Sequence, residues 1–141
     1  MKKIKHVTQY TPRACVAACI EMVTFGALDQ REIHRQMKAD SGRHGTGTED
    51  EYRQLVRMGF MPIPAVMNQL TMGDLLLVTV PSLNIIGGNH RVVIDLRDEH
   101  VLYDPNEGRE GAKLYDKDMQ NLNGFSEVTR VIDCRLEPAD A

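Results

Sequence analysis

The sequence lacks an apolar run long enough to cross a membrane. Its longest run, from Leu75 to Val80, falls far short of the roughly 18 consecutive apolar residues that a spanning helix requires. It also lacks an excess of basic residues, because 17 lysines and arginines are balanced by 20 aspartates and glutamates, and the formal net charge is −3. We therefore expect neither a membrane nor a nucleic acid as a partner.

Cysteines are too few for a disulfide framework and wrongly spaced for a metal site. Cys15 and Cys19 are one helical turn apart, but no second cysteine or histidine pair completes a zinc site. Three cysteines cannot all pair, which predicts at least one free thiol and a reducing, cytoplasmic location. We expect no metal ion and no organic cofactor, and we expect Cys134 to lie in the core.

The 141 residues show no linker-like segment and no internal repeat, which predicts a single domain over residues 1–141. Helical patterns come first and strand patterns follow, and this order predicts an α+β fold in which helices pack on an antiparallel sheet. The expected helices run from about Pro12 with Thr11 as cap, from the Asp29/Glu32 capping pair to Lys38, from Glu49 to Met58 after a Thr48/Glu51 capping box and before Gly59, and over Lys117 to Gln120. The expected strands are Leu75 to Val80, a hairpin on either side of Asp98-Glu99, and a closing strand from Val128 to Leu136.

Cys15 is the candidate nucleophile. It falls near the start of the first expected helix, where the helix dipole and unpaired backbone N–H groups favour a thiolate. An isolated cysteine on a helix with an apolar face is more often a small core residue, so this position alone does not predict catalysis.

The predicted hairpin supplies two further polar residues at one of its ends. His90 begins the first strand and Asp104 follows the second. A two-residue turn at Asp98-Glu99 would place the two side chains on opposite faces, because side chains alternate along a strand. If His90 and Asp104 are partners, the connection must contain an odd number of residues or a bulge.

These features together resemble the bacteriocin-processing cysteine peptidases of the papain-like clan, whose domains also head peptide-exporting transporters. The resemblance covers roughly residues 4 to 115. It is carried by Gln9 and Cys15 with the following Ala17-Ala18-Cys19-Ile20 and Met22, by His90-Arg91-Val92-Val93, and by Asp104-Pro105 with Gly108. The chain departs from the family beside the nucleophile, where Ala14 and Val16 replace the usual Asp and Gly, a difference that bears on substrate fit.

The resemblance implies a papain-like fold and a role for each candidate. Gln9 would donate to the oxyanion, Cys15 would attack, His90 would act as general base and acid, and Asp104 would orient the imidazole. The implied reaction is hydrolysis of a peptide or isopeptide bond in a peptide or protein substrate. Two alternatives stay open: deamidation or transamidation of a protein glutamine through the same thioester, and a binding module that does not turn over.

The remaining candidates concern the rim of the substrate cleft. Gly87 and Gly88 would let a substrate backbone approach closely, and Asn89 would line the same place. The glycine-rich stretch around His44 is expected to form a flexible rim. Among the other histidines, we expect His6 and His34 to be solvated and His100 to lie beside the hairpin turn, none with a catalytic role.

Overall fold

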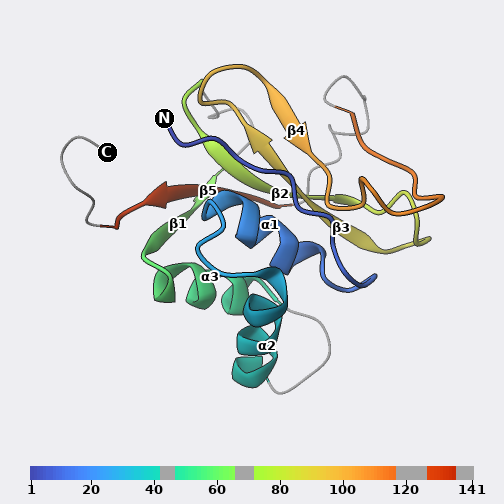
Figure 1. The fold of residues 1–141 in the computed structure, drawn as a ribbon, viewed down its shortest axis with the longest axis horizontal. Coiled ribbons are helices and arrows are strands. Elements are labelled where there is room, and N and C mark those ends of the chain that lie inside the picture. Colours follow the sequence, from blue (N-terminus) through green and yellow to red (C-terminus); the bar gives the residue numbers. More distant parts are fainter. Residues whose placement is uncertain (42–46, 66–71, 117–126, 136–141) are drawn as a thin grey trace.

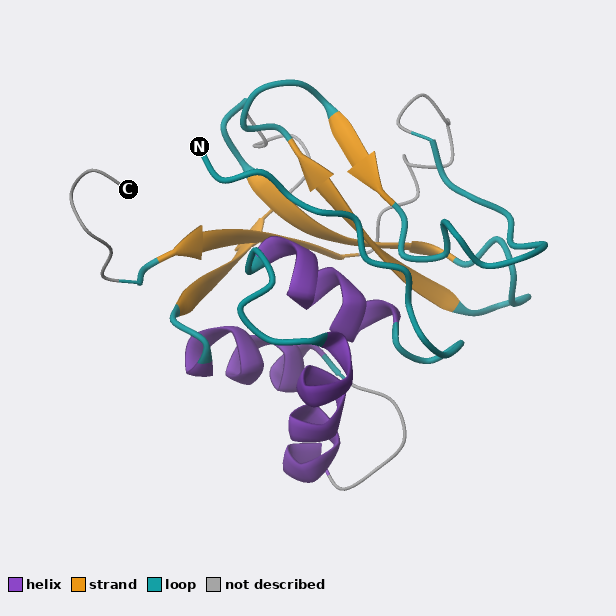
Figure 2. Cartoon of the chain, in the orientation of Figure 1, coloured by secondary structure: helices purple, strands orange, loops and turns teal. Residues whose placement is uncertain are grey.

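The computed structural model describes residues 1–41, 47–65, 72–116 and 127–135. Within them, helices come first and strands follow, and every strand pairing is antiparallel, so the predicted mixture of helices and antiparallel sheet is confirmed. The helices lie together on one side of the sheet (Figures 1 and 2). The elements are α1 (Cys15–Val23), α2 (Gln30–Ser41), α3 (Thr48–Arg57), β1 (Phe60–Ala65), β2 (Leu75–Pro81), β3 (Asn89–Asp95), β4 (Val101–Tyr103) and β5 (Glu127–Asp133).

The five strands of the described residues are ordered β1-β5-β2-β3-β4, so β5, the last of them along the chain, lies inside the sheet. The expectation that this strand closes the sheet is wrong, because β1 occupies the edge beyond it. β1 was not predicted, since it contains Pro62 and Pro64. Proline cannot donate a ladder hydrogen bond, but two prolines at alternate positions both turn their nitrogen toward the open side of an edge strand. The sheet therefore tolerates them there.

The strand β2 is apolar from Leu75 to Val78 because both faces of the sheet are covered at this point. On one face Leu75 and Leu77 belong to the core that contains the buried side chains of α1. On the other face Leu76, Val78 and Val80 pack with a second apolar cluster. Burial on both faces explains a continuous apolar strand where alternation would mark a half-exposed one.

The helix α1 begins later than its sequence pattern suggests. The predicted start at Pro12 with a Thr11 cap is wrong, because Thr11 closes a separate turn: its carbonyl accepts from Ala14 N at 3.2 Å and its hydroxyl from Arg13 N at 3.3 Å. The N-cap is Ala14, which has no capping side chain, and Cys15 is the first helical residue. The nucleophile candidate thus sits at the helix end itself.

Side chains expected to cap α2 and α3 serve only partly in that role. Asp29 does cap α2, through a 2.7 Å bond from Arg31 N, and the helix extends beyond Lys38 to Ser41. The expected Thr48/Glu51 capping box on α3 is wrong. The N-cap residue is Gly47, and its backbone N–H donates to the Asp50 carboxylate at 3.0 Å.

Residues with positive φ follow the ends of α1 and α3, and Gly59 stops α3 as expected. Gly59, at φ 92°, stops α3, and Phe25 and Gly26, at φ 56° and 74°, end α1. Positive φ is a conformation that breaks a right-handed helix and that glycine adopts readily. The predicted helix over Lys117 to Gln120 lies outside the described residues.

The hairpin has the odd connection that a His90–Asp104 contact requires. Asp95 pairs with Val101 and Val93 with Tyr103, so residues 96–100 form the loop in place of a two-residue turn. Continuing this register places Asp104 opposite Val92 and therefore on the same sheet face as His90. The predicted irregularity is confirmed.

Candidate active site

Cys15 occupies the first position of α1, half-buried at the edge of a cleft. The first turn of this helix contains no acidic residue, and Ala14 offers no side-chain acceptor. The positive end of the helix dipole is therefore available to a negative sulfur. The small buried residues Ala17 and Ala18 let the helix lie close to the sheet that carries His90.

The thiol of Cys15 faces the same cleft as the imidazole of His90, which is itself buried, and the two groups act on each other electrostatically. Burial opposes ionisation of the thiol, but the hydrogen bond and charge of His90, with the backbone N–H groups of Arg91 and Val16, lower the pKa of Cys15 below its ordinary value. Burial also opposes protonation of His90, yet its hydrogen bonds to Asp104 and Cys15 raise the pKa of the ring to about 9. These opposite shifts favour a thiolate on Cys15 paired with an imidazolium on His90.

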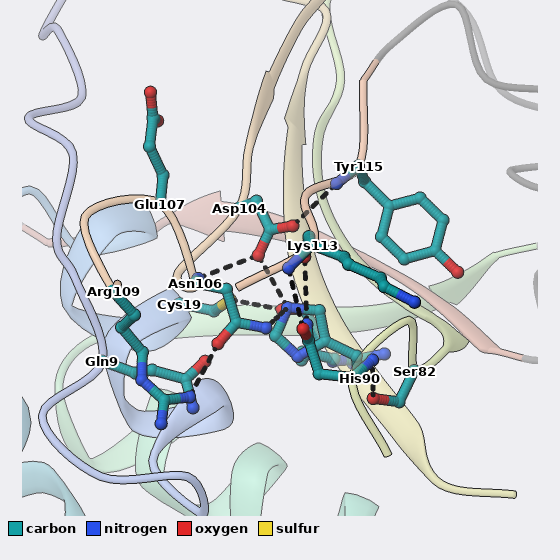
Figure 3. A network of polar contacts seen from close by, with 12 residues as sticks. Gln9, Cys19, Ser82, His90, Asp104, Asn106, Glu107, Arg109, Lys113 and Tyr115 are labelled. Carbon is teal, nitrogen blue, oxygen red and sulfur yellow. Dashed lines mark hydrogen bonds and ion pairs between the residues drawn. The ribbon is translucent and has the colours of Figure 1, made fainter. Parts of the chain in front are cut away.

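Asp104 holds the far side of the imidazole. Its Oδ1 lies 2.7 Å from His90 Nε2, so the ring presents its other nitrogen to the sulfur. Backbone N–H groups of Asn106 and Tyr115, each at 2.9 Å, bind the two carboxylate oxygens, as Figure 3 shows. Burial raises the pKa of Asp104, but the hydrogen bonds from His90 and these amides outweigh it and keep the carboxyl below its ordinary value. The carboxylate is thus ionised and fixed in place.

Asn106 is a neighbour of the imidazole that the sequence did not single out. Its Nδ2 lies 3.4 Å from His90 Nε2, and its Oδ1 accepts from Arg109 at 3.0 Å (Figure 3). The bond from Arg109 fixes which end of the amide faces the ring. No motif flags Asn106, because its place beside His90 follows from the fold of the loop after β4.

The loop that carries Asp104 is held by the amino-terminal segment. His6 Nε2 lies 2.8 Å from the carbonyl of Asp104, and the hydroxyl of Thr8 donates to Glu107 O at 2.7 Å. Gly108 lies so close that a Cβ there would be 2.6 Å from the Thr8 hydroxyl. His6 was expected to be solvated, which is wrong, because it is half-buried in this contact.

Gln9 is brought to the same region by a bond from its backbone N–H to Pro105 O at 2.8 Å. Its side chain is 3% exposed, and its Nε2 donates one hydrogen to Thr11 O at 2.8 Å. The second amide hydrogen is left for another acceptor, while Oε1 has no partner among the described residues. Burying such an acceptor unpaired costs about 1–3 kcal/mol, an expense more often found at functional sites than in plain cores.

Replacing Gln9 with alanine is expected to lower kcat about a hundredfold and to change KM little, because the lost donor acts on charge that develops in the transition state. The comparison uses steady-state kinetics on a peptide substrate. Gln54→Ala is the matched control, since Gln54 is a fully buried glutamine between α3 and α2. If both variants lose activity equally, Gln9 serves only to stabilise the fold.

The cleft beside Cys15 and His90 has a volume of about 560 Å³. Of the three residues predicted to bind substrate, Asn89 lines it, whereas Gly87 and Gly88 are not among its described lining residues. Gly87, at φ 73°, instead turns the β2–β3 loop, and the Gly88 N–H bonds to Ile85 O at 3.1 Å. Ile85, the residue of this loop that does reach the cleft, is 55% exposed.

A buried ion pair joins Arg91 to Glu51, and no sequence motif predicted it. Both side chains are almost fully buried, and the Arg91 guanidinium binds both oxygens of Glu51. Arg91 also donates to the hydroxyl of Thr79. The pair ties α3 to the strand that carries His90. A charged residue next to a histidine gives no sign in the sequence that its partner lies 40 residues earlier.

The other described cysteines, and the described histidines His34 and His100, lie outside the site. Cys19 is buried, with its thiol donating to Arg91 O at 3.3 Å, while Cys134 is exposed just after β5, so its expected place in the core is wrong. His34 was expected to be solvated but is buried, with Nδ1 2.7 Å from the Tyr10 hydroxyl. His100 is exposed in the β3–β4 loop, and His44 lies outside the described residues.

The described residues contain neither a metal-binding group nor a membrane-spanning helix. Among those residues, no group of three or more histidine, cysteine, aspartate or glutamate side chains could hold a metal ion. None of the described helices combines the length and apolar character of a membrane span.

Comparisons with known proteins place the fold. No protein-family model matches the chain, and no curated protein matches it. A solved structure does: the peptidase domain of Streptococcus ComA, a bi-functional ABC transporter involved in a quorum-sensing pathway, at a TM-score of 0.60 and 14% sequence identity. The two proteins share a fold. The match covers 94% of this chain and 97% of that domain.

At this low identity, the likeness to the ComA peptidase domain concerns architecture alone. It agrees with the predicted papain-like fold, and the extent of the match shows that the shared part is nearly the whole of both chains. Membership in the bacteriocin-processing family and the roles of the individual residues stay predictions.

Proposed function

We propose that this protein is a cysteine peptidase or closely related amide hydrolase that uses Cys15, His90 and Asp104. The observation that carries the proposal is the buried chain of contacts from the Cys15 thiol through the His90 ring to the Asp104 carboxylate, beside an open cleft. In a structural core, a raised histidine pKa and a lowered cysteine pKa would both be expensive to maintain.

The proposed reaction follows from the protonation states. The Cys15 thiolate attacks the substrate carbonyl carbon, and the resulting oxyanion is bound by the Cys15 backbone N–H and by Gln9. The His90 imidazolium then gives its proton to the leaving amine, and the C–N bond breaks to leave a thioester. Neutral His90 next takes a proton from water, whose oxygen attacks the thioester carbon. Collapse of that second intermediate releases the acid and restores the thiolate–imidazolium pair.

Selective alkylation of Cys15 is the direct test. Iodoacetamide at neutral pH should modify Cys15 much faster than exposed Cys134, although Cys134 is the more accessible thiol, because the neighbouring imidazole lowers the pKa of Cys15. Peptide mass spectrometry of a time course gives all three rates. If Cys134 reacts as fast as Cys15, the nucleophile is not activated and the peptide-binding alternative is favoured. If Cys15 reacts faster, a comparison of the peptides in host lysate treated with wild type or with Cys15→Ala would identify the substrate.

The pH dependence should separate the two members of the pair. Hydrolysis needs the His90 proton, so kcat/KM should fall as pH rises through about 9, and it should also fall in acid, once the Cys15 thiolate becomes protonated. Alkylation of Cys15 needs only the thiolate, so its rate should show the acid limb and no alkaline fall. Both rates are measured from about pH 5 to about pH 10.5. An alkaline limb shared by both reactions would contradict the assignment of the proton to His90.

A further inference from the structure

One side of the cleft is formed by polar residues of α3 and three strands. We call this the polar wall, and its members are Thr48, Glu51, Thr79, Arg91 and Glu127. It is part of the same cavity as Cys15 and His90, so a peptide bound for attack at Cys15 would lie against it.

The two buried charges of the polar wall cancel each other. Arg91 is 4% exposed and Glu51 is 3% exposed, and the guanidinium spans both carboxylate oxygens. The remaining guanidinium nitrogen donates to the Thr79 hydroxyl. Neither charge is therefore available to a substrate, since each is already paired and hydrogen-bonded.

Glu127 is the member of the polar wall whose charge is not neutralised by the Arg91–Glu51 pair. It is half-buried at the start of β5, and one carboxylate oxygen accepts the hydroxyl of Thr48. Arg91 contacts Glu127 through the backbone carbonyl, at 3.4 Å, and not through the carboxylate. Glu127 therefore gives the polar wall a net negative charge, fixed in position by Thr48 and partly open to the cleft.

The loop before the nucleophile carries the opposite sign. Arg13 lines the same cleft, two residues before Cys15, and its side chain is exposed. A cationic side chain would be attracted to Glu127 and repelled near Arg13, whereas an uncharged one would feel neither effect. The cleft thus favours one placement of a positive charge over the other.

We propose that the polar wall is a specificity subsite that receives a lysine or arginine side chain of the peptide substrate, with the Glu127 carboxylate as its partner. The inference rests on the proposed function, because it assumes that the peptide occupies the cleft at Cys15. The Thr48 hydroxyl holds one carboxylate oxygen of Glu127, and the other would accept from the ammonium or guanidinium group of the substrate.

The test compares pairs of peptide pools that differ by one charge. Each pool is randomised over uncharged residues except at one position, which holds arginine in one member and its neutral isostere citrulline in the other, and the fixed position is moved along the peptide. Binding is measured by fluorescence anisotropy in the Cys15→Ala background, and cleavage by mass spectrometry with Cys15 present. The protein variants are Glu127→Gln and the control Glu99→Gln, an exposed glutamate outside this cleft.

At one position of the series, the pool with arginine should bind and be cleaved about fivefold better than the pool with citrulline. A preference of this size is typical of a partly exposed ion pair. The preference should disappear in Glu127→Gln, persist in Glu99→Gln and shrink as salt is raised. Equal arginine-to-citrulline ratios with and without Glu127, in both binding and cleavage, overturn the subsite.

The two proposals fail in different ways. If no pool is cleaved but the Glu127-dependent preference appears in binding, the subsite holds and the hydrolase proposal is the one in error. If pools are cleaved by a Cys15-dependent reaction without any Glu127-dependent preference, the reverse is true. Absence of binding to every pool at concentrations up to about 1 mM overturns the subsite, since the cleft then takes no peptide of this kind.

Discussion

Substitution of His90 by alanine is expected to lower kcat by at least about a thousandfold, because one ring performs two tasks. It lowers the pKa of Cys15 through a hydrogen bond and a positive charge, and it carries the proton for the leaving amine. Without the ring, only the backbone N–H groups of Arg91 and Val16 oppose the effect of burial, and the pKa of the thiol should rise to its ordinary value or above it. The nucleophile would then be almost entirely protonated at neutral pH.

Two measurements check this expectation. Steady-state kinetics give the loss in kcat, and the pH dependence of iodoacetamide alkylation gives the pKa of Cys15 in each protein. His34→Ala is the burial-matched control, since His34 is a buried histidine bonded to Tyr10 outside the cleft. Unchanged reactivity of Cys15 in His90→Ala would mean that the helix end alone activates the thiol, and the proposed acid–base role would lose its support.

Substitution of Glu51 by alanine is expected to reduce the free energy of unfolding by about 3–5 kcal/mol. The change leaves the guanidinium of Arg91 buried without its carboxylate, and an uncompensated charge is expensive in a low-dielectric interior. Since many domains are stable by only about 5–15 kcal/mol, the variant would be close to unfolding. Urea denaturation followed by circular dichroism measures the difference.

Two controls separate the orphaned charge from a simple loss of contact. Glu49→Ala removes an exposed glutamate of the same helix that pairs with Arg53, and should cost less than about 1 kcal/mol. A double replacement of Glu51 and Arg91 by methionine removes both charges and should recover most of the loss. This recovery is expected because the ion pair provides little net stability. Burial raises the pKa of Glu51 by more than the charge and hydrogen bond of Arg91 lower it. If Glu51→Ala is no less stable than Glu49→Ala, the pair does not stabilise the wall of the cleft.

The sequence predicted the chemistry-bearing contacts better than it predicted the sheet. The His90–Asp104 contact could be anticipated because parity along a hairpin is a local rule, and it demanded the odd connection that the structure has. The position of β5 inside the sheet could not be anticipated, because strand order depends on pairings between distant segments of the chain. The prolines of β1 hid that strand, since only its place at the sheet edge makes them acceptable.

Tertiary contacts also explain the errors around α3. Thr48 and Glu51 have the spacing of a capping box, but Thr48 binds Glu127 and Glu51 binds Arg91. Each side chain therefore serves a distant strand, while the shorter Asp50 caps the helix. A local motif predicts a local partner only when nothing further along the chain competes for the same oxygen atoms.

The contacts between the amino-terminal segment and the Asp104 loop have a consequence for folding during translation. His6 and Thr8 meet the Asp104 loop across separations of 98 and 99 residues, and the ring that activates Cys15 belongs to the later part of the chain. While a ribosome is still translating the middle of the chain, Cys15 has already been made but His90 has not. The thiol therefore lacks both the imidazole and the cleft of the folded protein. Contacts between residues so far apart in the sequence form late in folding. We therefore expect the Cys15 thiol of a nascent chain to be unactivated until the carboxy-terminal half has folded.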